Sequence, residues 1–128
     1  MKIVGHGIDL IDLTKVRKHL DNPNKDWIDA VFSAAERAQA DPAPHDVEFY
    51  GGRYAAKEAV VKALGTGFSD DVAWIDVEIL RTETGSPEVH LSAGALEVAT
   101  TFGVTQWLVS ISHSGEFAVA SAIAIAAQ

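Results

Sequence analysis

The chain has 128 residues, 48% of them hydrophobic, no cysteine and a formal net charge of −8. This length allows one domain, residues 1-128, and the lack of cysteine excludes disulfides and thiol chemistry. No apolar run is long enough to span a bilayer, and the first residues lead into an expected strand instead of a signal peptide. We therefore expect a cytoplasmic protein.

The first expected strand covers residues 2–10 and is loosened by two glycines, Gly5 and Gly7. Asp9 lies within its apolar run, where a carboxylate is costly unless its pKa shifts or a cation accompanies it. We expect Asp9 to meet a cation, either a side chain or a metal ion. Asp12 directly precedes the next apolar-periodic segment and is the better candidate for a helix N-cap.

A helix is predicted over residues 12–21, and its polar face is basic through Lys15, Lys18 and His19. Residues 1–62 contain nine Lys and Arg against ten Asp and Glu, whereas residues 63–128 contain one against eight. The acidity therefore belongs mainly to the second half of the chain. The basic face could dock an acidic partner, and an ordinary solvated helix face is the alternative.

A short helical turn is predicted near residues 26–32, followed by a capping box in which Ser33 caps a helix and Glu36 reaches back. We prefer this structural role for Glu36 to metal ligation. After a proline-containing loop at 41–44, a long helix is predicted from about 46 to 64.

The long helix is rich in alanine, ends at Gly65 and carries Arg53, Lys57, Glu58 and Lys62. Arg53 and Lys57 are four residues apart, as are Glu58 and Lys62, so each pair is stacked on the helix surface. One carboxylate among three cations suits a metal-bridged polyanion such as a pyrophosphate. The alternative is a solvated face with an ordinary Glu58–Lys62 helical ion pair.

The second half predicts strands at 75–79 and 88–91, a helix at 93–102, and a hairpin formed by strands 106–112 and 117–125. Small side chains share one face of the last strand, where a helix or another subunit could approach closely: Ala118, Ala120, Ala122 and Ala124. The fold class is therefore α+β, with a largely antiparallel sheet packed on one long helix.

His113 stands where the apolar face of the strand at 106–112 ends, between Ser112 and Ser114. A histidine at such a position is either a satisfied structural residue or a ligand-binding group. The pattern alone leaves both interpretations open.

Five segments occur in an order that resembles the bacterial holo-acyl carrier protein synthases, the small 4'-phosphopantetheinyl transferases. They are GID at 7–9, FSAAE at 32–36, RYAAKEA at 53–59 followed by KALGTG at 62–67, GSP at 85–87, and SISHS at 110–114. The segments span most of the chain, and the central block is the most specific of them.

The resemblance implies a homotrimer with active sites in the clefts between subunits. It implies transfer of the 4'-phosphopantetheine group from coenzyme A to a serine of apo-acyl carrier protein, a step of fatty acid biosynthesis that releases adenosine 3',5'-bisphosphate. The expected partners are coenzyme A, apo-acyl carrier protein and further copies of the chain. No nucleic acid or membrane partner is expected.

The resemblance also assigns roles to residues. Asp9 and Glu58 would hold Mg²⁺, Glu58 would act as base directly or through a metal-bound water, and Lys62 would assist the departing phosphate. Asp9, Glu58 and Lys62 are thus the expected catalytic residues. Carrier-protein docking is assigned to the first helix, through Lys15 and Lys18. The expected cofactor-binding residues are Arg53, Lys57, Gly65, Gly85, Pro87 and His113.

Two positions depart from the family pattern: Lys15 stands where arginine is usual, and Ser86 where lysine is frequent. Lysine cannot make the bidentate carboxylate contact of arginine.

Two other functions fit the same charged residues. One is a magnesium-dependent hydrolase of nucleotide pyrophosphates, and the other is a non-catalytic module that binds carrier protein or coenzyme A.

Overall fold

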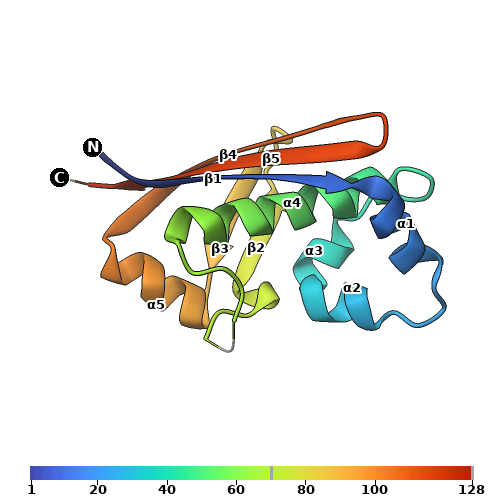
Figure 1. Ribbon diagram of the computed structural model, residues 1–128, viewed down its shortest axis with the longest axis horizontal. Helices are drawn as coiled ribbons and strands as arrows, with labels where there is room; N and C mark the ends of the chain where they lie inside the picture. Colours follow the sequence, from blue (N-terminus) through green and yellow to red (C-terminus); the bar gives the residue numbers. More distant parts are fainter. Residues whose placement is uncertain (70, 128) are drawn as a thin grey trace.

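The computed structural model describes residues 1–69 and 71–127, and the strands in these ranges form two antiparallel sheets. The larger sheet has the order β1-β5-β4 and the smaller pairs β2 with β3 (Figure 1). The strands are β1 (Lys2–Asp12), β2 (Val77–Arg81), β3 (Pro87–Leu91), β4 (Val104–Ser114) and β5 (Phe117–Ala126). The predicted hairpin is confirmed as β4 and β5.

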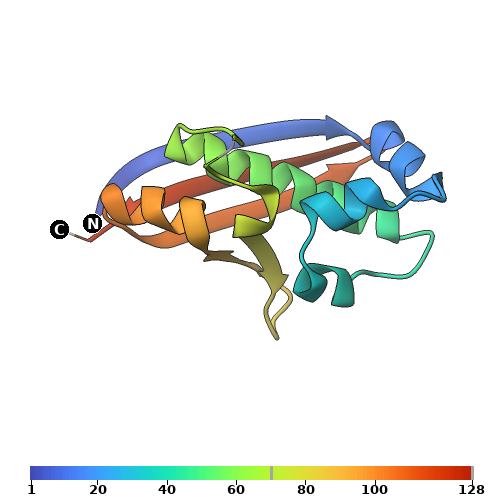
Figure 2. The same cartoon turned by 90° about the horizontal axis from the view of Figure 1, so that it is seen from below.

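The long helix α4 runs along one face of the larger sheet, which confirms the predicted α+β architecture. It begins and ends at the predicted residues, Asp46–Leu64. Three shorter helices gather at one end of α4 and α5 lies toward the other (Figure 2). The other helices are α1 (Leu13–Asp21), α2 (Asp26–Val31), α3 (Ala34–Ala38), α5 (Ala93–Thr101) and a 3-10 turn, η1 (Trp74–Asp76). None of the described helices has the length and hydropathy needed to cross a bilayer.

Small residues let α4 lie close against the sheet. Alanines of α4 pack on Ala120 and Ala122 of β5 in the main core. On β1, a Cβ atom at Gly7 would overlap the carbonyl oxygen of Ala59, and one at Gly5 would overlap that of Ala63. The ladder between β1 and β5 is irregular between Ile3 and Gly5, as expected of a strand with glycines, and both glycines also allow the backbone of the strand to touch the helix.

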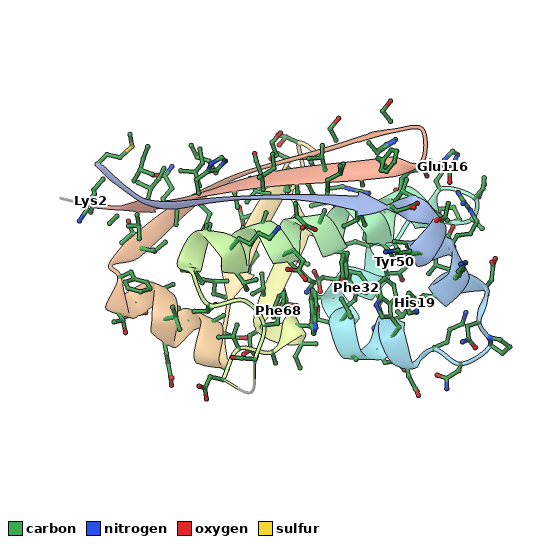
Figure 3. All side chains as sticks on the ribbon, viewed as in Figure 1. Lys2, His19, Phe32, Tyr50, Phe68 and Glu116 are labelled. Carbon is green, nitrogen blue, oxygen red and sulfur yellow. The ribbon has the colours of Figure 1, made fainter. Side chains whose placement is uncertain are left out.

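A second cluster of buried apolar side chains joins α1 and α2 to the first half of α4. Phe32 is fully buried there and its ring lies 4.8 Å from that of Tyr50; both are labelled in Figure 3. The buried members are Leu13, Val16, Val31, Phe32, Phe49, Tyr50 and Ala118. This cluster fixes α1 beside α4 and so determines one wall of the site described below.

The N-caps of two helices agree with the predictions, whereas the start of one strand does not. Asp12 Oδ1 accepts from the Thr14 amide at 2.9 Å, as expected of the N-cap of α1. The capping box of Ser33 and Glu36 is present at α3. The strand expected at 75–79 begins only at Val77, because Asp76 Oδ2 accepts from the Ala73 amide and closes the 3-10 turn.

The face of the larger sheet opposite α4 carries exposed apolar side chains. Ile8 and Leu10 on β1 are 57% and 64% exposed, and Leu108 on β4 and Phe117 on β5 are about half exposed. None of the described helices covers this face (Figures 1 and 2). An apolar surface of this kind is typical of a contact between protein molecules.

Candidate active site

Three of the predicted site residues meet where β1 crosses α4. Asp9 follows Gly7 by two residues on β1, so both face the helix. Glu58 and Lys62 are one turn apart on α4. The Lys62 ammonium donates to Asp9 Oδ1 at 2.9 Å and to the Ile8 carbonyl oxygen at 3.0 Å.

The expectation that Asp9 meets a cation is confirmed, and the cation is Lys62. The ion pair joins strand to helix, with the Asp9 side chain 15% exposed and that of Lys62 49% exposed. Among the ion pairs of the described residues there is none between Glu58 and Lys62. An ordinary helical ion pair therefore does not explain Lys62.

A pocket of about 430 Å³ opens beside these three residues. The helix α1 supplies one wall through Lys15, Val16 and His19, and aromatic side chains supply another through Trp27 and Tyr54. The His19 ring stacks on Trp27 with centroids 4.4 Å apart; Figure 3 labels His19 at this end of the molecule. The pocket thus brings the charged side chains of Asp9, Glu58 and Lys62 together with apolar and basic side chains of α1 and α2.

The electrostatics of the pocket favour a proton-accepting Glu58. Burial raises the pKa of the Glu58 carboxyl, the negative charge of Asp9 raises it further, and Lys62 opposes both. A carboxylate with a raised pKa is a better general base than an exposed one, because its pKa lies closer to the working pH.

The raised pKa makes a prediction about stability. The folded protein holds the Glu58 proton more tightly than the unfolded chain, so stability should fall as the pH rises above the ordinary value of 4.5 and through the raised pKa. In the absence of metal ions, Glu58→Gln should therefore raise the melting temperature at pH 8 but not at pH 4. Calorimetry checks this, with Glu97→Gln on the exposed face of α5 as the control. An equal shift at both pH values would contradict the prediction.

The donor set of the pocket fits Mg²⁺. Magnesium is usually held by one or two carboxylates together with water and phosphate oxygens, and Asp9 and Glu58 are both oriented into the pocket. The described residues contain no group of three or more His, Cys, Asp or Glu side chains suited to a metal ion. An ion here would therefore take its other ligands from water or substrate.

Other predicted site residues line a second pocket, of about 260 Å³. Arg53 lies five residues before Glu58, which places it on a different side of α4, roughly 140° away. It lines this pocket together with His113 at the end of β4, Gly85 in the turn between β2 and β3, and Pro87 at the start of β3. Of the three cations expected around Glu58, which are Arg53, Lys57 and Lys62, Lys62 alone lines the same pocket as Glu58.

The position of Lys57 does not support its predicted role in phosphate binding. Its side chain is fully buried and its ammonium lies 2.8 Å from Glu36 Oε1, whose side chain is also fully buried. The same ammonium donates to the carbonyl oxygens of Trp74 and Val77. Glu36 Oε2 also accepts from the Ile79 amide at 2.9 Å. Lys57 therefore ties α4 to α3 and β2 in the core.

The remaining predicted residues have simpler positions. Gly65 ends α4 in the left-handed conformation, with φ 79°. Lys15 lines the first pocket and Lys18 lies exposed on α1, with Lys15 and Lys18 both near the carboxylate of Asp12. These positions leave the basic face of α1 open to a partner.

The sequence reasoning missed the aromatic wall. Tyr54 lies four residues before Glu58 and eight before Lys62, so helical spacing alone places the three on one stripe. That signal was available. Trp27 was not predictable in the same way, because α2 reaches α4 only through the packing of Phe32 and its neighbours. Arg81, which lines the second pocket, was also missed.

Comparison with known proteins identifies the family to which the chain belongs. The profile of the 4'-phosphopantetheinyl transferase superfamily matches residues 5–122. A holo-[acyl-carrier-protein] synthase of Desulforudis audaxviator is 42% identical over 123 residues, which cover 96% of this chain and 93% of that protein. One of Natranaerobius thermophilus is 40% identical over 121 residues, covering 94% and 96%.

A solved structure agrees with these relatives. The holo-(acyl-carrier-protein) synthase of Bacillus anthracis str. Ames, in complex with CoA (3',5'-ADP), has a TM-score of 0.81 and 35% identity, with 98% of each chain covered. The chain therefore belongs to the 4'-phosphopantetheinyl transferase superfamily, among its holo-[acyl-carrier-protein] synthases. The family resemblance drawn from the five sequence segments is confirmed.

Proposed function

We propose that the chain transfers the 4'-phosphopantetheine group from coenzyme A to a serine hydroxyl of apo-acyl carrier protein. The products are holo-acyl carrier protein and adenosine 3',5'-bisphosphate. The observation that supports this best is the meeting of Asp9, Glu58 and Lys62 in one pocket of a chain that belongs to this family. A cytoplasmic location stays a prediction.

The residues of the pocket match the demands of phosphoryl transfer, which are positioning and charge neutralisation. Asp9 and Glu58 would hold Mg²⁺, which would neutralise charge on the pyrophosphate. The Glu58 carboxylate accepts the proton of the serine hydroxyl as the serine oxygen bonds to phosphorus. The bond from that phosphorus to the adenosine bisphosphate breaks, and the Lys62 ammonium donates a hydrogen bond to the departing oxygen.

The release of adenosine 3',5'-bisphosphate tests this function against its two alternatives. The protein is incubated with coenzyme A and Mg²⁺, with and without apo-acyl carrier protein, and the bisphosphate is measured by chromatography. A transferase releases it only when the carrier is present. Release without the carrier would identify a hydrolase, and no release under either condition would identify a binding module.

We propose α1 as the docking surface for the carrier protein. Lys15 lines the pocket and Lys18 lies exposed one turn along, so the two present positive charge beside the reacting groups. The rest of the chain is acidic, which makes this face a distinct electrostatic feature. Complementary surface charges mainly set the rate of encounter and are screened by salt.

Charge reversal on α1 makes a prediction. The variant with Lys15→Glu and Lys18→Glu should have a raised KM for the carrier protein, with the KM for coenzyme A nearly unchanged. Wild-type activity should decline with added salt, and that of the double variant should decline less. Steady-state kinetics at low and high salt check this. An unchanged carrier KM together with an unchanged salt response would exclude α1 as the docking surface.

We propose a homotrimer in which the two pockets of one chain serve two active sites. The first pocket holds the carboxylates and the second holds Arg53 and His113, on a different side of α4. The exposed apolar face of the larger sheet, with Ile8, Leu10 and Leu108, supports association of subunits. The second pocket would then complete the first pocket of a neighbour. Light scattering that shows a monomer at assay concentration would contradict this assembly.

A further inference from the structure

The last turn of α1 presents a histidine at the first pocket. His19 is exposed and lies one helical turn after Lys15, on the basic face that also carries Lys18. His19, which is labelled in Figure 3, lines the pocket together with Lys15. Histidine is the side chain that ordinarily changes its charge between pH 5 and 8. The docking surface proposed above therefore combines two lysines with one side chain whose charge depends on pH.

The His19 ring lies flat on the indole of Trp27, with centroids 4.4 Å apart and an angle of 7° between the planes. Trp27 in turn contacts the rings of Phe32 and Tyr54, at 5.4 and 5.7 Å. A cation within about 6 Å of the centre of an indole face is attracted by the ring. The C-terminal end of a helix also attracts positive charge, and His19 lies in the last turn of α1. The stack and the helix end therefore orient the imidazole and stabilise its protonated form.

Both ring nitrogens of His19 are available to a partner. Within the described part of the chain, the His19 side chain makes the stack with Trp27 and takes part in no hydrogen bond or ion pair. A neutral imidazole offers one donor and one acceptor, whereas a protonated imidazole offers two donors. Protonation therefore gives this position a second N–H group and a positive charge, which are the properties that bind a carboxylate.

The charged groups around His19 include both signs. In the pocket, Asp9 and Lys62 are paired with each other at 2.9 Å. At the end of α1, the Lys25 ammonium donates to a carbonyl oxygen of the helix at 2.8 Å. The other charged side chains of the pocket, of the last turn of α1 and of the start of α2 are Asp12, Lys15, Lys18, Asp21, Asp26 and Glu58. An acidic partner that docks here adds negative charge and so favours the protonated imidazole.

We propose that protonation of His19 strengthens the docking of apo-acyl carrier protein on α1, so that carrier binding responds to pH through this side chain. The inference rests on the proposed function, in which α1 receives the carrier protein, and adds a form of regulation to it. Lys15 and Lys18 do not supply this response, because lysine is ordinarily charged throughout the range in which histidine titrates. Binding therefore tightens as the pH falls and His19 becomes the third cation of the surface.

Calorimetric binding of apo-acyl carrier protein, without coenzyme A, tests the proposal in the absence of turnover. His19→Gln replaces the neutral imidazole by a neutral amide, so its Kd should equal that of the wild type at pH 8. At pH 6 the wild type should bind about 2- to 5-fold tighter than His19→Gln, the factor that one exposed charge pair provides. His19→Lys should exceed His19→Gln by this factor at both pH values. The control is His90→Gln on β3, where His90 lies 2.7 Å from Glu88, and it should bind as the wild type does at both.

The titration of His19 itself provides the second readout. Because binding equilibria are reciprocal, the carrier protein must raise the pH at which His19 loses its proton, by about 0.3–0.7 on the pH scale for a 2- to 5-fold effect. NMR of the imidazole protons in the free and the carrier-bound enzyme measures this change.

Two results would overturn the proposal while leaving the transfer activity intact. One is a His19 titration that the carrier protein does not change, and the other is an equal pH dependence of binding in the wild type and His19→Gln. If His19→Gln does not fold, His19→Lys decides, and binding equal to that of the wild type at pH 8 would overturn the proposal. Failure of the wild type to bind the carrier at either pH would refute the docking surface and this inference with it. Binding that follows His19 without any transfer of phosphopantetheine would instead refute the proposed function alone.

Discussion

Replacing either carboxylate of the first pocket, in Asp9→Ala or Glu58→Ala, should reduce the rate of phosphopantetheine transfer by at least about 100-fold. Each variant removes a ligand for Mg²⁺, and Glu58→Ala also removes the proposed base. Neither residue is part of the hydrophobic core, since both line the open pocket, so the fold should persist. Initial rates at saturating Mg²⁺ and circular dichroism spectra measure the two properties.

The control for these variants is Glu97→Ala, which removes an exposed carboxylate from α5 without touching the pocket. Its rate should equal that of the wild type. Near-normal turnover by either Asp9→Ala or Glu58→Ala at saturating Mg²⁺ would exclude the two-carboxylate site.

Replacing Lys57 by methionine should destabilise the protein by about 3–5 kcal/mol, because it leaves the carboxylate of Glu36 buried without its cation. Burial lowers the pKa of Lys57, and the negative charge of Glu36 opposes that change. Urea unfolding measures the effect. Lys25→Met, at an exposed lysine, should cost far less.

A double-mutant cycle separates the ion pair from the other contacts of the two side chains. Glu36→Gln removes the charge while keeping an acceptor for the Ile79 amide. The double variant with Lys57→Met should be more stable than the sum of the single effects predicts, by about 0.5–3 kcal/mol. Strict additivity would show that the pair has no coupling. Loss of coenzyme A binding in a stably folded Lys57→Met protein would restore the phosphate-binding role that the sequence suggested.

The sequence predicted the elements well because each has a strong local signal. The alanine-rich helix with its terminal glycine, the capping box at Ser33 and the N-cap at Asp12 all depend on residues within a few positions of each other. The strand β2 was predicted two residues too early, because a single side chain, Asp76, accepts a hydrogen bond from the Ala73 amide and closes a 3-10 turn there. Alternation in the sequence does not reveal that bond.

The sequence predicted which residues belong to the site better than it predicted how they are arranged in space. Helical spacing predicts which charged residues of α4 lie one turn apart. The partner that each cation meets depends instead on the elements packed around the helix. Lys57 and Lys62 are both lysines on one helix, yet one is fully buried against Glu36 from α3 and the other meets Asp9 from β1. No local pattern distinguishes these two partners, because they are brought in from residues 21 and 53 positions away in the sequence.

The mass of the acyl carrier protein tests the central claim most directly. Apo-acyl carrier protein is incubated with the enzyme, coenzyme A and Mg²⁺, and its intact mass is then measured with wild-type enzyme and with Glu58→Ala. The account predicts a gain of one 4'-phosphopantetheine group, located on a serine, with the wild type and little or none with the variant. An unchanged carrier mass with folded wild-type enzyme, under conditions in which coenzyme A binds, would contradict it.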